Sequence, residues 1–118
     1  MVLTFNEERN LSRCLQSVAD WTRQIFVIDS GSADHTAEIA GNFKATLIKH
    51  SFETHSKQWK WALENLPFST DWVLCLDADQ HVTPQLKDEL IQLFLKKKEL
   101  DAYDGLYVKR KYFFLGQW

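Results

Sequence analysis

Short apolar runs alternate along this chain with longer segments in which apolar residues recur every three or four positions. The apolar runs lie at residues 1–5, 24–29, 45–49 and 72–76, and their length predicts buried β-strands. Each run is followed by a segment whose apolar spacing is typical of one face of an α-helix. The residues expected on these inward faces are, in chain order, Leu11, Cys14, Leu15 and Val18, then Thr36, Ile39, Ala40 and Phe43, then Trp59, Ala62, Leu63 and Leu66, and finally Leu86, Leu90, Leu93 and Phe94.

Polar residues ahead of these segments predict where the helices begin. Asn6 is expected to cap the first helix, and the acidic Glu7 suits its first turn because it complements the helix dipole. Asp34 is the expected cap of the second helix. Thr83 followed by Pro84 is a strong start signal for the fourth, a cap residue followed by a first-turn proline.

The alternation of strand and helix predicts the fold class. A chain that alternates in this way forms an α/β domain, with a mainly parallel sheet and helices on both faces. We expect right-handed crossovers and the strand order three-two-one-four, with the reversal of order between strands one and four. Residues 106–114 predict a final strand, and residues 1–118 contain no linker or repeat that would divide them into further domains.

Three polar clusters follow strands one, two and four. They are the segment that contains Thr4, Asn6 and Glu7, the segment that begins at Asp29, and the segment 77–79. Because ligands bind such sheets at the carboxyl ends of the strands, the three clusters should converge on one crevice. The sequence therefore predicts a binding site at this edge of the sheet.

The third cluster carries two aspartates, Asp77 and Asp79, with only Ala78 between them. Carboxylates this close repel one another unless a cation compensates their charge. A few hard oxygen ligands suit Mg²⁺ or Mn²⁺, with the phosphates of a ligand completing the coordination shell. Asp29 would then be available to accept a hydrogen bond from a base N–H or a ribose hydroxyl. The alternative is that these aspartates are ordinary turn residues.

Composition narrows the function classes without identifying one. The net charge of −2 gives no general reason to expect a nucleic-acid partner, and there is no glycine-rich phosphate loop. Cys14 and Cys75 lie in apolar patterns and are expected to be reduced core residues. The histidines show no ligand spacing, and the tryptophans are interpreted as packing residues. The sequence also lacks a membrane-spanning run and a signal peptide, so we expect a cytoplasmic protein, or one that contacts the inner face of the membrane peripherally.

The segments "LTFNEERNLSRCLQSV", "VIDSGSADHTAEIA" and "WVLCLDADQHVTPQL" together resemble the N-terminal half of family 2 glycosyltransferases. The resemblance covers essentially the whole chain and is greatest to bacterial enzymes of lipopolysaccharide core and surface-glycan assembly. It implies a Rossmann-like GT-A fold that binds a nucleotide-diphosphate sugar, with UDP as the default nucleotide. It also implies a divalent cation, Mn²⁺ or Mg²⁺, inversion at the sugar carbon, and a glycan or lipid-linked acceptor.

The resemblance assigns roles to individual positions. It places Asp29 at the base, Asp77 toward the ribose and the metal, and Asp79 at the metal. The remaining residues that it places around the nucleotide sugar are Thr4, Asn6, Glu7, Lys57, Gln58 and Ala78.

This sequence departs from the family pattern at two positions of the site. Gln80 stands where related sequences often carry a fourth acid, and Lys60 where an asparagine is common. The catalytic base of the family lies in its C-terminal half, so we expect it beyond Trp118 and expect the chain to be part of a longer protein. The catalytic residue is therefore unknown from this sequence.

Two other functions fit parts of the pattern. A haloacid-dehalogenase phosphatase also places DxD after an apolar strand, although normally after the first strand and followed by Gly-Thr. A non-catalytic nucleotide- or metal-binding module would retain the same visible residues. The basic residues Lys109, Arg110 and Lys111 beside an aromatic tail predict either contact with an anionic membrane or an uncovered strand.

Overall fold

The computed structural model describes residues 1–111. Its centre is a four-stranded sheet made of β1 (Val2–Thr4), β2 (Phe26–Asp29), β3 (Thr46–Lys49) and β4 (Leu76–Asp77). All neighbouring strands pair in parallel, and the order is β3-β2-β1-β4. The predicted parallel sheet and its order, including the reversal between β1 and β4, are confirmed.

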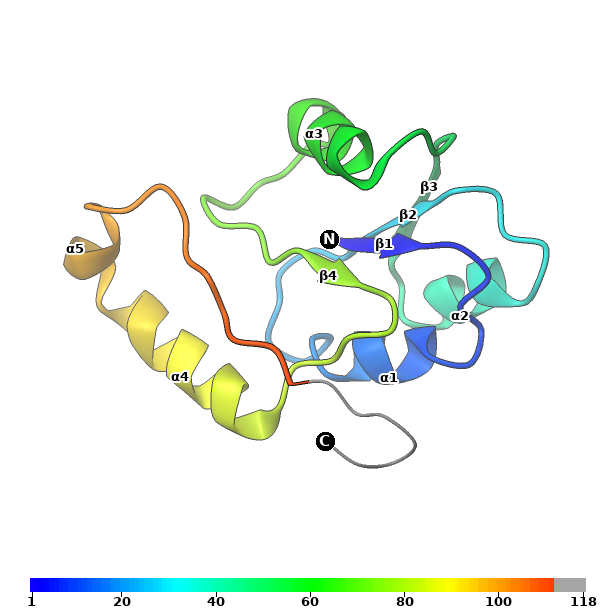
Figure 1. Cartoon of the computed structure of the whole chain (residues 1–118). Coiled ribbons are helices and arrows are strands. Elements are labelled where there is room, and N and C mark those ends of the chain that lie inside the picture. The colour runs from blue at the N-terminus through cyan, green and yellow to red at the C-terminus, as the bar shows by residue number, and fades with distance from the viewer. Residues whose placement is uncertain (112–118) are drawn as a thin grey trace. The chain divides into compact units, whose positions relative to one another are not determined.

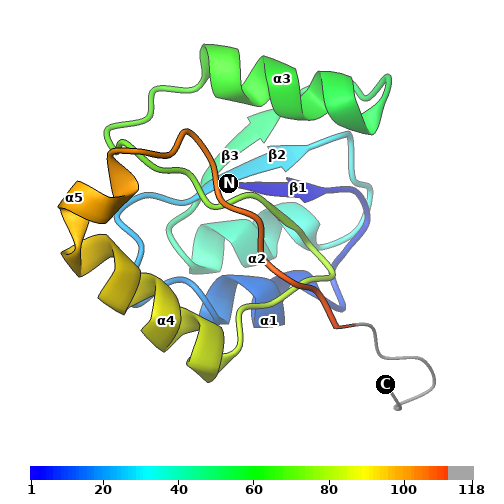
Figure 2. The ribbon, with the colours of Figure 1, turned by 60° about the vertical axis from the view of Figure 1, so that its left-hand side comes forward.

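Helices follow the strands as the apolar spacing predicts. They are α1 (Leu11–Gln16), α2 (Thr36–Asn42), α3 (His55–Asn65), α4 (Pro84–Leu95) and the short α5 (Lys97–Leu100). Figures 1 and 2 show α3 on one face of the sheet and α1 and α2 on the other. Residues 1–84 form one compact unit that contains the sheet and α1 to α3, and the described residues 85–111 belong to a second. No helix within residues 1–111 has the length and apolar character needed to cross a bilayer.

Two apolar clusters hold the first unit together, one on each face of the sheet. Successive side chains of a strand point to opposite faces, so Val2 and Val27 face α1 and α2 while Leu3 and Ile28 face α3. Leu11, completely buried, belongs to the first cluster, and Ala62 of α3 belongs to the second. The stripes of α1, α2 and α3 therefore cover both faces of the sheet, whereas no residue of the stripe predicted for α4 is buried.

The prediction that Asn6 caps the first helix is wrong. The helix begins at Leu11, with Asn10 in the N-cap position. Asn6 instead has a positive φ of 51°, and its backbone N–H donates to Ser32 Oγ at 2.8 Å. The loop after β1 is shaped by bonds to a distant loop, which outweigh the local capping preference.

The fourth strand is shorter than its apolar run. Only Leu76 and Asp77 pair with β1, whereas residues 72–76 were expected to form the strand. Two further backbone bonds flank this pairing: the Met1 amino group donates to Leu74 O, and the Leu76 N–H donates to Met1 O. Cys75, directly before this short strand, is exposed, which contradicts its prediction as a core residue.

Other local predictions have mixed outcomes. Leu63, expected in the inward stripe of α3, is 51% exposed. Asp34 lies one residue before the N-cap position, yet its carboxylate accepts the N–H of Thr36 at 3.0 Å. Residues 106–111 form no strand, and the remainder of that predicted strand lies outside the described residues. Helix α4 does begin at Pro84.

We expect Leu11→Ala to lower the free energy of unfolding by about 2–5 kcal/mol, because it removes buried methyl groups and leaves a cavity between α1 and the sheet. Leu63→Ala is the matched control, the same change on an exposed helix position, and should cost less than about 0.5 kcal/mol. Urea denaturation measures both variants. Equal losses would show that α1 does not pack as described.

We expect only one of the two thiols to react in the native protein. Cys14 is completely buried, and burial raises the pKa of its thiol to about 12, so it stays protonated and inaccessible near pH 8. Cys75 is exposed, although partial desolvation raises its pKa as well. Titration with a disulfide reagent should release one equivalent quickly, and a second after denaturation. Two fast equivalents from the native protein would contradict the placement of Cys14.

Candidate functional site

The three polar clusters converge on one edge of the sheet. Thr4 lies directly opposite Asp29 in the β1–β2 pair, and Leu3 lies opposite Asp77 in the β1–β4 pair. All of these strands run parallel, so their carboxyl ends meet at the same edge. The predicted convergence of the clusters is confirmed, and this edge is the candidate site. The aspartate pair follows β4 rather than β1, unlike the arrangement that the phosphatase alternative requires.

Asp29 is a buried carboxylate held by the turn that follows it. The residue is 1% exposed, and its two oxygens accept the Ser32 N–H at 3.1 and 3.3 Å together with the Ser32 hydroxyl. Gly31 makes this turn possible, because its φ of 101° lies where residues with a side chain are strained. Asp29 is thus a turn residue whose carboxylate keeps lone pairs for a further donor.

The hydroxyl of Thr4 is buried without a partner. Thr4 is 5% exposed, and its Oγ1 accepts or donates no hydrogen bond within the described part of the chain. Its carbonyl oxygen, in contrast, accepts the Ser30 N–H at 3.1 Å. An unpartnered buried hydroxyl is unusual, because leaving it unpaired costs about 1–3 kcal/mol. It lies at the strand ends, beside Asp29.

Asn6 and Glu7 connect the loop after β1 to the loop after β2. Asn6 Oδ1 accepts the Ala33 N–H at 2.9 Å, and the Glu7 N–H donates to Thr36 Oγ1 at 3.1 Å. Glu7 also accepts a hydrogen bond from the Asn10 side chain at 2.9 Å. Both predicted site residues therefore lie at the expected edge and shape the backbone there.

The two aspartates of the third cluster have different surroundings. Asp77 Oδ1 lies 2.9 Å from His55 Nε2, and the Asp77 N–H donates to Gln80 Oε1, also at 2.9 Å. Ala78 is buried, and its N–H donates to Leu3 O, which extends the β1–β4 pairing. Asp79 is exposed and makes no hydrogen bond or ion pair with any residue in the described range. One carboxylate is therefore oriented and the other is free.

This pair fits a cation that takes few ligands from the protein. No cluster of three or more histidine, cysteine, aspartate or glutamate side chains within residues 1–111 could enclose a metal ion. Asp77 and Asp79 together can offer carboxylate oxygens at the rim of the site, with the rest of the shell left to a ligand. Such sparse coordination is what Mg²⁺ commonly adopts with phosphates.

Lys57 and Gln58 are neighbours in the sequence, but their side chains contact different residues. Lys57 Nζ donates to Glu53 Oε2 at 2.6 Å on the exposed side of α3, which raises the pKa of Lys57 and lowers that of Glu53. Gln58 is 2% exposed: its Oε1 lies 2.6 Å from His50 Nδ1, and its Nε2 donates to His50 O at 3.1 Å and to Ser30 Oγ at 3.4 Å. Gln58 therefore attaches α3 to the ends of β2 and β3.

Sequence reasoning missed the histidines of this edge. His50 stacks on Trp61 with ring centroids 3.7 Å apart, and His55 contacts Asp77. Neither contact follows from ligand spacing along the chain. The one available signal is that both residues follow β3 closely, and so fall at the carboxyl edge of the sheet.

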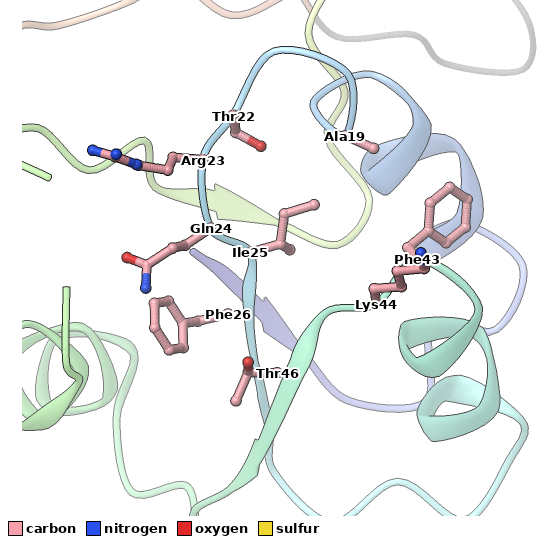
Figure 3. A pocket seen from close by; sticks show the side chains of 9 residues that line it. All are labelled: Ala19, Thr22, Arg23, Gln24, Ile25, Phe26, Phe43, Lys44 and Thr46. Carbon is pink, nitrogen blue, oxygen red and sulfur yellow. The ribbon is translucent and has the colours of Figure 1, made fainter. Parts of the chain in front are cut away.

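A separate hollow of about 300 Å³ lies at the opposite edge. Figure 3 shows its side chains around the amino ends of β2 and β3. The lining residues are Ala19, Thr22, Arg23, Gln24, Ile25, Phe26, Phe43, Lys44 and Thr46. All of them differ from the predicted site residues. Because ligands of parallel sheets bind at the carboxyl ends, we favour the polar edge over this hollow as the functional site.

Comparison with known proteins identifies similar chains. The chain is 32% identical over 108 residues to an uncharacterised glycosyltransferase of Rickettsia typhi, covering 92% of this chain and 36% of that protein. It is 28% identical to the lipopolysaccharide core biosynthesis glycosyltransferase LpsC of Rhizobium meliloti, covering 84% and 37% respectively. The chain thus spans little more than a third of these relatives.

A solved structure has the same fold. The crystal structure of S. aureus TarS 1–349 in complex with UDP superposes with a TM-score of 0.60 and 23% identity, covering 93% of this chain and 37% of that one. This likeness confirms the predicted GT-A fold. The sequence profile described as glycosyl transferase family 2 matches residues 1–117. By this match, which covers almost the whole chain, the protein belongs to glycosyl transferase family 2.

Proposed function

We propose that this chain binds the donor of a reaction that transfers a sugar from a nucleotide-diphosphate sugar, UDP-sugar by default, to a glycan or lipid-linked acceptor. The observation that carries the proposal is the convergence of Thr4, Asp29, Asp77 and Asp79 on one edge of the sheet in a family 2 chain. Similarity to LpsC supports a role in the synthesis of lipopolysaccharide or another surface polysaccharide. The UDP complex of TarS supports the choice of nucleotide.

The β1–β2 side of the edge is proposed to bind the nucleoside. The buried Thr4 hydroxyl lacks a partner among the described residues and would gain one from a ribose or base. Asp29 accepts hydrogen bonds only, so it favours a base that presents an N–H. Uracil presents such a donor at N3, whereas cytosine presents an acceptor there. Asn6 and Glu7 would act by holding the loop that borders this side.

The β4 side of the edge is proposed to hold the cation and the diphosphate. Asp79 and Asp77 would ligate Mn²⁺ or Mg²⁺, which when bound neutralises the charge that develops on the leaving diphosphate. Asp77 brings an oriented carboxylate, and Asp79 brings one that can turn toward the ion. The proposed reaction is a direct displacement: the acceptor hydroxyl attacks the anomeric carbon of the sugar while the nucleotide diphosphate leaves, with inversion at that carbon.

The acceptor side of the reaction is proposed to depend on residues outside this chain. A general base must take the proton of the acceptor hydroxyl, and its absence costs about 10²–10⁴ in rate. We expect this base beyond Trp118, so the chain alone should bind donor and transfer sugar poorly. A cytoplasmic location at the inner face of the membrane, where lipid-linked acceptors occur, belongs to the same proposal, with the exposed Lys109, Arg110 and Lys111 as the membrane contact.

Asp79→Asn should remove the metal-dependent part of UDP binding, because an amide lacks the charge that holds a hard cation. Titration calorimetry with UDP, with and without Mn²⁺, measures this part. Asp71→Asn is the matched control: it changes an exposed aspartate that precedes the amino end of β4, and it should leave binding unchanged. If Asp79→Asn binds UDP with the Mn²⁺ dependence of the wild type, Asp79 does not hold the metal. Asp77 and Asp79 are then interpreted as ordinary turn residues.

Asp29→Asn should change base preference and leave the contribution of Mn²⁺ intact. The amide oxygen can still accept the Ser32 N–H, but the amide nitrogen cannot accept the Ser32 hydroxyl and instead offers a donor to the base. We expect the preference for UDP over CDP to fall, measured as the ratio of the two dissociation constants. An unchanged ratio, or a loss of the Mn²⁺ effect, would contradict the role assigned to Asp29.

A further inference from the structure

We propose that His55 is a positioning residue for Asp77, whose carboxylate it holds in the orientation that the donor and its cation require. The inference rests on the proposed function and extends it to a residue that neither the motif nor the family comparison assigns. His55 and Asp77 come from different elements, the first turn of α3 and the end of β4, and lie 22 positions apart in the sequence. Their contact is a tertiary feature of the site.

The direction of the hydrogen bond follows from the chemistry of the two groups. His55 Nε2 lies 2.9 Å from Asp77 Oδ1, well within the range for an N–H···O bond. An ionised carboxylate has no proton to give, so the imidazole must donate. This choice assigns the Nε2 proton to His55. The bond occupies Oδ1 and leaves Oδ2 available to a ligand.

His55 itself is held in place, although its side chain is 57% exposed. Its ring meets that of Trp59, one turn further along α3, edge to face with centroids 5.9 Å apart and planes at 77°. The start of α3 is capped by Thr54, whose hydroxyl accepts the Lys57 N–H at 3.2 Å. Gln58 anchors the same turn to the strand ends. The helix therefore presents the imidazole from a fixed position.

The other basic residue in the first turn of α3 is directed elsewhere. Lys57 pairs with Glu53 at 2.6 Å, so it does not contact Asp77 in this structure. Histidine–carboxylate pairs behind a metal or ligand group fix the orientation of that group, and their loss typically costs 10- to 100-fold in metal affinity or activity. Asp79, which has no such support from any described residue, serves as the adaptable member of the pair.

The test compares His55→Leu with His55→Gln in the intact chain. Leucine keeps an apolar contact with Trp59 but has no donor, whereas the glutamine amide offers an N–H toward the position of Nε2. We expect His55→Leu to weaken UDP binding about 10- to 100-fold in the presence of Mn²⁺ and far less without it. We expect His55→Gln to recover most of this loss. Calorimetry gives the affinities, and thermal unfolding checks that both variants fold.

His35→Leu is the matched control. His35 Nδ1 also lies 2.9 Å from a carboxylate, that of Glu8, and its side chain is exposed, but Glu8 is not among the proposed ligand-binding residues. This variant should bind UDP as the wild type does. A general effect of removing a histidine–carboxylate bond would lower affinity in both variants and would overturn the inference.

The outcomes separate this inference from the proposed function. If His55→Leu binds UDP with the affinity and the Mn²⁺ dependence of the wild type, the role of His55 is overturned and the proposed function stands. An equal loss with and without Mn²⁺, or a His55→Gln variant as weak as His55→Leu, also overturns it, because the effect would not pass through the hydrogen bond to Asp77. Wild-type protein that binds no UDP with Mn²⁺ overturns the proposed function and this inference together.

Discussion

The parallel register of β1 with its two neighbours is the constraint on which the rest of this structure depends. β1 has three residues, and it is the strand that pairs with both β2 and β4. In this register Val2 and Leu3 enter apolar clusters on opposite faces, and Thr4 comes to lie beside Asp29. A shift by one residue would exchange the faces and remove both clusters. The same register that buries the core therefore brings the polar strand ends together.

The three carboxylates at this edge differ in how firmly they are held. Asp29 is buried and bonded to its own turn, Asp77 is oriented by one histidine, and Asp79 is exposed. Groups that must recognise a fixed hydrogen-bond pattern benefit from rigidity, since less entropy is lost when the ligand arrives. Under the proposed function, Asp79 would meet an ion that arrives with the phosphates of its ligand, and its freedom would let it adjust to that ion. The carboxylate at the end of β2 is therefore held most firmly, and the one that follows β4 least firmly.

Periodicity was sufficient to predict the first three strands and the buried faces of α1 and α2, because burial repeats along the chain, and the strand order followed once the polar strand ends were considered too. It failed for the strand expected from residue 106 onward, for Leu63 and for α4, of which no residue is buried. It was also sufficient to place Asp29 and Asp77 on one edge, since this follows from parallel topology. The misses have a different origin. Asn6 is bonded to a loop 26 residues away, His55 to a strand end 22 residues away, and β4 pairs with β1 through only two of its residues. Such contacts depend on which loops meet in space, and no local pattern encodes them.

Ser32 joins more of this edge than its size suggests. Its hydroxyl accepts the N–H of Asn6 and donates to Asp29, while its own N–H donates to the same carboxylate. Substitutions at positions 6, 29 and 32 are therefore expected to have non-additive effects on stability. A substitution at one of these positions is therefore felt at the other two, because all three share the hydrogen bonds of Ser32. The loop after β1 and the loop after β2 thus behave as a single mechanical unit joined through one serine.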